Sequence, residues 1–279
     1  MRCLILLIIV LFFVELVSSE GAGESLLVGA FNVQIFGKSK IKKDDVIGVL
    51  TKVLSRYDLV LVQEIRDSSE TSFPELVNQL NSEYDDLYEY EMSERVGRTS
   101  SKEQYGFIYR KDKLEVKSMY QVADELDLFE REPFIVRFGR IDNAGLLSEF
   151  TFIALHAKPD DAIAEMNNLV EVYDEARRHY GPDAIIAGDL NADCSYVCES
   201  CWNEVQLRKD PRFRWIISDD ADTSVSRNSC AYDRIILAGE ELQKNGYCSN
   251  VFRYGEEYKL EEELVADVSD HFPVEFTIN

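Results

Sequence analysis

The sequence predicts an α/β fold in which two β-sheets pack together and helices lie outside them. Three observations support this prediction. Eight short apolar segments are bounded by turn-forming residues, as expected of strands. Two longer segments repeat apolar residues at helical spacing, and a third, shorter segment is also predicted as a helix. Some neighbouring strands have no helix between them, a mixture that favours a two-sheet core covered by helices.

The predicted strands span residues 26–33, 58–65, 105–109, 134–138, 150–156, 184–189, 234–238 and 273–278. The predicted helices span residues 44–57, 74–80 and 160–179. In the first helix one face carries Val46, Val49, Leu50, Val53 and Leu54. In the third helix one stripe carries Ile163, Met166, Leu169, Val170 and Tyr173. Gly181 and Pro182 follow the third helix and predict its end.

The first residues have the pattern of a secretory signal peptide, predicted to span residues 1–19. A basic start precedes an apolar run, and small residues follow near Ser19. The run is shorter than the roughly 20 residues that a membrane-spanning helix needs, which disfavours an anchor. Residues 20–279 contain no linker-like or low-complexity stretch, so we expect one secreted domain.

The composition is strongly acidic, with 52 Asp and Glu residues against 30 Lys and Arg residues and a net charge of −22. This balance argues against a protein that binds polyanions through a general basic surface. It suits a secreted protein or one that recruits divalent cations. A nucleic-acid substrate would therefore require a few placed arginines together with a bound metal.

Five cysteines follow the predicted signal peptide, and a secreted protein is expected to oxidise most of them. Cys198 and Cys201 have the spacing of a redox or zinc motif. No second pair follows at zinc-ribbon spacing, which favours structural disulfides with one thiol left over.

Polar side chains recur at the ends of the predicted strands. They are Asn32, Gln63, Glu64, His156, Asp189, Asn191, Asp233, Asp270 and His271. Residues i and i+2 of an extended segment share a face, so Asp189 and Asn191 can point at one spot. Carboxylate and amide oxygens suit Mg²⁺. An imidazole beside a carboxylate can move the proton of an attacking water.

Several motifs together resemble the secreted deoxyribonuclease I-type endonucleases, which belong to a larger superfamily of metal-dependent phosphodiesterases. The motifs are AFN (30–32), VQEIRD (62–67), GRTSSKEQY (97–105), REP (131–133), ALHAKP (154–159), GDLNADCSYV (188–197), CAYDR (230–234) and VSDHFPVE (268–275). The resemblance implies a four-layer α/β sandwich. It also implies a monomer that hydrolyses DNA at the P–O3′ bond, leaves a 5′-phosphate and does not act at membranes.

The resemblance also implies the roles of individual residues. Glu64 would be the main ligand of Mg²⁺ (or Mn²⁺), helped by Asn32 and Asp270. Asp189 and Asn191 would hold the scissile phosphate and the attacking water.

His156, oriented by Glu103, and His271, oriented by Asp233, would be the general acid and base, in an order that stays open. The DNA backbone and minor groove would be contacted by Arg66, Arg98, Arg131 and Tyr232.

Two loops are implied as structural Ca²⁺ sites. The first carries the alternating oxygens of Asp222, Ser224, Ser226 and Asn228, beside an implied Cys194–Cys230 disulfide. An ordinary polar loop is an equally good interpretation of this segment. The second comprises Asp124, Asp127, the backbone oxygen of Phe129, and Glu132.

Two other functions compete with DNA cleavage. A relative with the same catalytic core could hydrolyse a lipid head group, and a secreted calcium-binding protein could keep the scaffold without activity. The three arginines and the CAYDR motif favour DNA, and no implied catalytic position is substituted. Fold resemblance alone does not fix a function.

Overall fold

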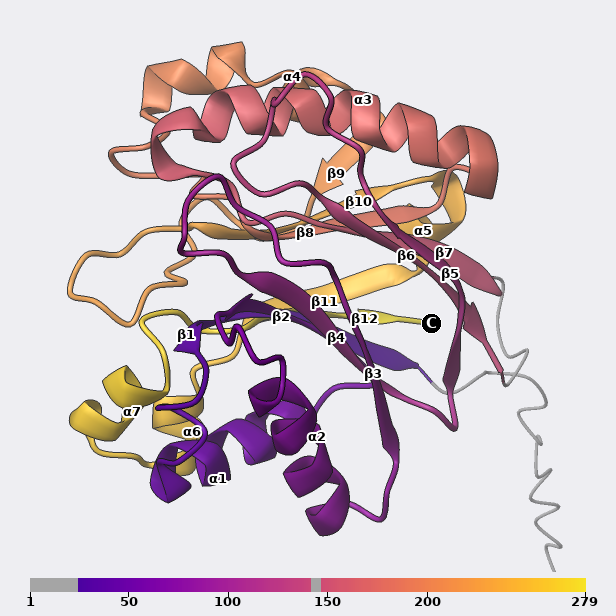
Figure 1. The fold of residues 1–279 in the computed structure, drawn as a ribbon. Helices are drawn as coiled ribbons and strands as arrows, with labels where there is room; N and C mark the ends of the chain where they lie inside the picture. Colours follow the sequence, from indigo (N-terminus) through magenta and orange to yellow (C-terminus); the bar gives the residue numbers. More distant parts are fainter. Residues whose placement is uncertain (1–24, 142–146) are drawn as a thin grey trace, which may run out of the picture.

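The computed structural model describes residues 25–141 and 147–279, in which two six-stranded sheets lie face to face with helices on both outer sides (Figure 1). This arrangement confirms the predicted four-layer α/β sandwich. The proposed signal peptide, residues 1–19, lies outside the described residues.

The first sheet has the strand order β11-β12-β1-β2-β4-β3. Its strands are β1 (Leu26–Phe36), β2 (Leu59–Ile65), β3 (Tyr88–Met92), β4 (Gln104–Arg110), β11 (Gly246–Val251) and β12 (Val274–Ile278). The central strands β1 and β2 are parallel, and the other neighbours are antiparallel.

The second sheet has the order β5-β6-β7-β8-β10-β9. Its strands are β5 (Leu114–Gln121), β6 (Phe134–Arg140), β7 (Glu149–Ala154), β8 (Ala184–Asp189), β9 (Phe213–Trp215) and β10 (Asp233–Ala238). Here the parallel pair is β7 and β8. Each sheet therefore places one parallel pair at its centre.

Helices cover the outer face of each sheet (Figure 1). On the first sheet lie α1 (Asp44–Leu54), α2 (Ser72–Glu83), α6 (Tyr254–Tyr258) and α7 (Glu262–Val268). On the second sheet lie α3 (Ala162–Tyr180), preceded by the short η1 (Pro159–Asp161), and α4 (Gln206–Lys209), preceded by η2 (Glu199–Glu204). The remaining helix, α5 (Glu240–Asn245), links β10 to β11.

Three buried apolar clusters hold these layers together. Aromatic rings such as Phe107 and Phe152, with centroids 4.8 Å apart, fill the space between the two sheets. The predicted apolar face of α1 is buried on the first sheet. From the predicted stripe of α3, Met166, Leu169 and Tyr173 are buried, while Ile163 and Val170 are partly buried.

The sequence-based strand assignment missed four strands, namely β3, β5, β9 and β11. All four are edge strands of their sheets. An edge strand needs less apolar surface than a central one, and charged residues there also discourage pairing between molecules. In β5, for example, exposed residues such as Glu115 and Lys117 alternate with half-buried residues. The strand therefore lacks a continuous apolar run.

The cysteine prediction is confirmed. Cys194 pairs with Cys230, and Cys198 pairs with Cys201. Cys248 is the free cysteine of the described residues. Among the helices of residues 25–141 and 147–279, none combines the length and the apolar character required to cross a bilayer.

Candidate active site

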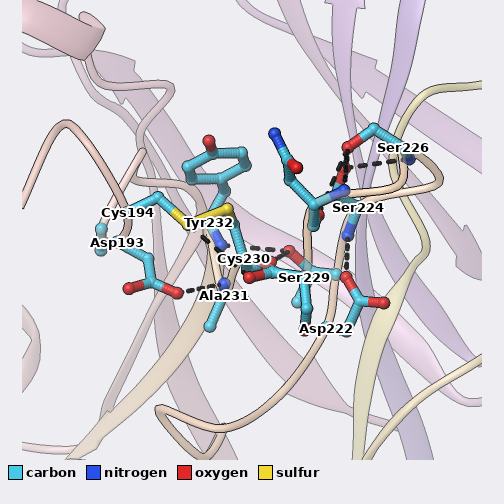
Figure 2. The surroundings of a disulfide bond; sticks show 12 residues. Asp193, Cys194, Asp222, Ser224, Ser226, Ser229, Cys230, Ala231 and Tyr232 are labelled. Carbon is cyan, nitrogen blue, oxygen red and sulfur yellow. Dashed lines mark hydrogen bonds between the residues drawn. A yellow bond between two sulfur atoms is a disulfide. The ribbon is translucent and has the colours of Figure 1, made fainter.

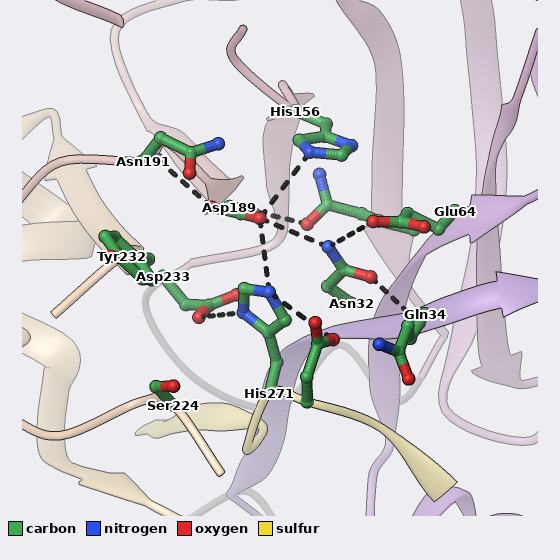
Figure 3. A network of polar contacts seen from close by, with 12 residues as sticks. Asn32, Gln34, Glu64, His156, Asp189, Asn191, Ser224, Tyr232, Asp233 and His271 are labelled. Atoms are coloured by element: carbon green, nitrogen blue, oxygen red, sulfur yellow. Dashed lines mark hydrogen bonds and ion pairs between the residues drawn. The ribbon is translucent and has the colours of Figure 1, made fainter. Parts of the chain in front are cut away.

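The polar strand ends of both sheets meet at one edge of the sandwich (Figure 3). Asn32 and Glu64 come from the carboxyl ends of β1 and β2, and Asp189 ends β8. His156 follows β7 by two residues, and His271 precedes β12. The carboxyl ends of parallel strands meet at the same edge of a sheet, which is why the two central pairs gather these side chains.

A buried glutamine ties the two sheets together at this edge. Gln63 Nε2 donates to the carbonyl oxygen of Leu155 at 2.9 Å, and its Oε1 accepts from the amide of Asp189 at 2.8 Å. Asn32 Nδ2 crosses the same gap and donates to Asp189 Oδ2 at 3.1 Å. These bonds fix the distance between the β2 and β8 sides of the site.

His156 is held by a buried carboxylate. Its Nδ1 lies 2.5 Å from Glu103 Oε1, and Arg131 and Arg66 contact the same carboxylate at 2.9 and 3.2 Å. Burial acts to raise the pKa of Glu103, but His156 and the two guanidinium groups lower it to about 2. Burial acts to lower the pKa of His156, and the ionised Glu103 outweighs that effect and raises it.

His271 is held in the same way from the opposite side. Its Nδ1 lies 2.8 Å from Asp233 Oδ2, and Asp233 is itself buried. Burial acts to lower the pKa of His271, yet Asp233 and then Asp189 raise it to about 10. A carboxylate on Nδ1 fixes the ring orientation and leaves Nε2 for chemistry.

Both free imidazole nitrogens point at one oxygen. Nε2 of His156 and Nε2 of His271 lie 3.5 and 3.6 Å from Asp189 Oδ2, as Figure 3 shows. They border an open hollow of about 310 Å³. The hollow is lined by Glu64, Arg66, Arg131, His156, Pro159, Asp189, Asn191, Tyr196, Tyr232, Asp270 and His271.

Glu64 and Asn191 reach the site through left-handed backbone conformations, with φ of +61° and +48°. Such angles are uncommon for residues other than glycine and cluster at functional sites. Asn191 donates through its amide to Asp189 Oδ1 at 3.0 Å and through Nδ2 to the carbonyl oxygen of Ala157 at 2.9 Å. Glu64 accepts from Asn32 Nδ2 at 3.1 Å and from the amide of Ile35 at 2.9 Å.

The donor set suits a hard divalent cation on the Glu64 side of the hollow. Carboxylates of Glu64 and Asp270 line it, and Asn32 adds an amide beside Glu64. A second group, Asp189, Asp233 and His271, has ligand atoms within 4.8 Å of one another. There, His271 Nδ1 and Asp233 already bond to each other, just as Glu64 Oε2 already pairs with Arg66 Nη2 at 3.1 Å.

The arginines expected to contact DNA divide into two groups. Arg66 and Arg131 line the hollow, as does Tyr232, whose ring lies 5.5 Å from that of Tyr196. Arg98 lies outside the lining, and its Nε pairs with Asp127 Oδ1 at 2.7 Å.

The first loop implied as a Ca²⁺ site is shown in Figure 2, beside the Cys194–Cys230 disulfide. Ser224 Oγ donates to Ser226 Oγ at 2.8 Å, and Ser226 Oγ donates to the carbonyl oxygen of Asn228 at 3.3 Å. Asp222 accepts from the amide of Ser224 and, through Oδ2, from Arg253 Nη2 at 3.2 Å. A guanidinium therefore already neutralises this carboxylate.

The second loop has the same feature. Asp127 forms an ion pair with the Arg98 guanidinium, and Asp124 Oδ2 accepts a hydrogen bond from the amide of Phe129 at 2.8 Å. Glu132 follows in the same loop, and its carbonyl oxygen accepts from Gln121 Nε2 at 2.6 Å.

Some residues that support the site carry no recognisable signal in the sequence. Glu165 of α3 looks like a solvent-facing helical carboxylate, yet it is buried and accepts from the amides of Glu130 and Lys158 at 2.8 and 3.2 Å. Glu130 precedes Arg131, and Lys158 follows His156 by two residues. Glu165 therefore links the loop that contains Arg131 to the loop that contains His156. Burial raises the pKa of Glu165 to about 7.

Comparisons with known proteins agree with this geometry. The chain matches the Endonuclease/Exonuclease/phosphatase family over residues 29–271. It is 39% identical to Deoxyribonuclease-1 of Bos taurus, covering 92% of this chain and 93% of that protein. It is 40% identical to Deoxyribonuclease gamma of Homo sapiens, covering 91% of this chain and 86% of that protein.

Solved structures support the fold. D. rerio TDP2 complexed with a single strand DNA product superposes with a TM-score of 0.62 at 13% identity, covering 92% of this chain and all of that one. The human Nocturnin catalytic domain with bound sulfate superposes with a TM-score of 0.60 at 12% identity, covering 91% of this chain and 94% of that one. The family match and the identity to these deoxyribonucleases show that the chain belongs to the deoxyribonuclease I group of the endonuclease/exonuclease/phosphatase family.

Proposed function

We propose that the protein is a secreted, divalent-metal-dependent deoxyribonuclease that cuts DNA with little sequence preference. The observation that carries the proposal is the convergence of two carboxylate-held histidines on Asp189 Oδ2. Two proton-transferring groups on either side of one anchoring oxygen suit the hydrolysis of a phosphodiester. The relatives named as deoxyribonucleases give the substrate class.

The reaction needs one proton removed from water and one delivered to the leaving O3′. One imidazole accepts the water proton at Nε2 while the other donates from Nε2, and Glu103 and Asp233 keep both rings in place. Asp189 and Asn191 position the phosphate and the attacking water between the rings.

Glu64, with Asn32 and Asp270, would hold Mg²⁺ or Mn²⁺. When bound, the ion neutralises the negative charge that develops on the phosphoryl oxygens. Arg66 and Arg131 add positive charge at the same hollow, which offsets the repulsion expected from the net charge of −22.

Ca²⁺ is proposed as a structural ion for the loops carrying Asp222 and Asp124. Its entry requires Arg253 to leave Asp222 in the first loop and Arg98 to leave Asp127 in the second. Once released, Arg98 would be available to DNA phosphates at the rim. We also propose that the protein acts as a monomer and that it contacts the backbone and the minor groove of DNA.

A plasmid assay tests it. Mature protein is incubated with supercoiled DNA in Mg²⁺, in Mg²⁺ with Ca²⁺, and in chelator, beside a choline-release assay on sphingomyelin. We expect nicked circles carrying 5′-phosphates with Mg²⁺, no nicking in chelator, and no choline. Choline release without nicking would replace the proposal with a lipid-directed phosphodiesterase, and inactivity in both assays would favour the silent calcium-binding protein.

A further inference from the structure

The end of β1 has an unusual backbone next to the candidate active site. Gln34 and Ile35 are consecutive residues at φ of +44° and +49°, and the pairing of β1 with β2 shifts between Asn32 and Phe36. A β-branched residue in the left-handed region is a steric outlier, which glycine or asparagine would avoid. The bulge therefore carries a residue that is poorly suited to its own backbone.

The Ile35 side chain is also exposed, with 58% of its surface accessible. Folding gains little from an isoleucine placed in water, so hydrophobic burial does not account for it. The backbone of the bulge does have a structural task, because the amides of Ile35 and Gln34 donate to Glu64 Oε2 and Asn32 Oδ1 at 2.9 and 3.0 Å. A glycine could supply the same amides, so this task does not explain the side chain.

The position of Ile35 suggests what the side chain does. Its amide contacts Glu64, which lines the hollow between the two histidines. Its side chain lines a second hollow of about 330 Å³, together with Gln34 and Lys43. Ile35 is thus an exposed apolar residue that lines this second hollow and bonds through its amide to a residue of the candidate active site. Because Glu64 lines the same hollow as His156 and His271, a DNA phosphate that enters this hollow would come close to Ile35.

We propose that Ile35 contacts the apolar sugar and base edges of duplex DNA beside the scissile phosphate. The inference rests on the proposed function. Exposed isoleucines are among the apolar wedges that proteins press into the minor groove. Burial of such a side chain against DNA contributes to binding through apolar area rather than charge.

Three variants test the inference. Ile35→Gly removes the side chain and relieves the backbone. Ile35→Val keeps a β-branched apolar group. Asp85→Gly is a matched control, because Asp85 is an exposed residue at φ of +55° in the turn after α2. That turn lies at the opposite end of the first sheet, beside the Lys111–Asp86 pair.

We expect Ile35→Gly to raise KM for plasmid DNA about tenfold, which corresponds to the loss of one apolar contact. The Mg²⁺ concentration for half-maximal activity should not change, and kcat should stay within about twofold. The thermal midpoint should rise by about 2 to 4 °C, because backbone strain is relieved. Ile35→Val should match the wild type, and Asp85→Gly should leave KM unchanged.

The inference fails if Ile35→Gly leaves KM unchanged while the wild type nicks normally. It also fails if the loss of activity comes with a higher Mg²⁺ requirement, since Ile35 would then act through Glu64. A lower thermal midpoint would show that the side chain stabilises the fold. Absence of nicking by the wild type would overturn both this inference and the proposed function.

Discussion

His156 and His271 approach the same oxygen, Oδ2 of Asp189, at 3.5 and 3.6 Å. They lie far apart in the sequence, next to strands that belong to different sheets. Each has its own buried carboxylate on Nδ1. Each side of the site therefore has one histidine with its own carboxylate, and both histidines share Asp189.

Removing either histidine should nearly abolish DNA cleavage. His156→Ala and His271→Ala each lose one proton transfer, which we expect to slow plasmid nicking at least about 100-fold. The double variant should be little slower than the single ones, because the two groups act in one step. Single-turnover nicking rates measure this, with His179→Ala on the exposed end of α3 as control. Near-normal rates in both single variants would show that the site is misplaced.

Salt should weaken activity steeply if phosphate contacts dominate binding. For two or three neutralised phosphates, KM should rise about 10- to 40-fold between 50 and 200 mM salt. If Arg98 reaches a phosphate, Arg98→Gln should reduce the slope of log KM against log salt by about one. An unchanged slope would mean that Arg98 stays with Asp127, its partner at 2.7 Å.

Asp67 should make the fold sensitive to acid. It accepts from the amides of Ser69, Thr71 and Ser72 and so caps the start of α2. Burial opposes ionisation, but hydrogen bonds from Ser69 and Ser72 hold the pKa of Asp67 well below its usual range. A depressed pKa in the folded state means stability that is complete above the unfolded pKa and is lost as pH falls.

Asp67→Asn should therefore lower the free energy of unfolding by about 2 kcal/mol at pH 7, the scale of a lost helix cap with unpaired amides. The difference from the wild type should shrink progressively below about pH 4. Urea unfolding at several pH values measures it. A difference that is constant with pH would mean that the carboxylate charge is not involved.

Arg253 should compete with Ca²⁺ for the Asp222 loop. Arg253→Gln frees the carboxylate, so Ca²⁺ should raise the thermal midpoint of this variant more than that of the wild type. Arg227 lies exposed in the Asp222 loop, so the rate of trypsin cleavage after Arg227 reports on this loop. In Arg253→Gln this rate should become sensitive to Ca²⁺. Arg110→Gln, which frees Asp112 at a remote turn, is the control. Equal Ca²⁺ responses in wild type and Arg253→Gln would exclude the competition.

The sequence predicted the central strands and the residues at their ends well, because buried parallel strands combine continuous apolar runs with polar termini. It predicted the four edge strands poorly, since β3, β5, β9 and β11 carry mixed polar patterns that also fit loops. The sequence identifies Gln63 as a polar strand end, but it reveals neither the bridge that Gln63 forms between the sheets nor the role of Glu165, for another reason. Their partners are the amide of Asp189 and the amides of two loops, and backbone groups leave no mark in a sequence.

Asp189 is the residue on which the account depends most, and Asp189→Asn keeps its size while removing its charge. The decisive measurement is the single-turnover nicking rate of this variant in saturating Mg²⁺, with the thermal midpoint recorded beside it. We predict a fall of at least about 100-fold, the scale of losing one preorganised electrostatic group, with a midpoint close to that of the wild type. A folded Asp189→Asn protein that nicks DNA within about tenfold of the wild-type rate would contradict the account.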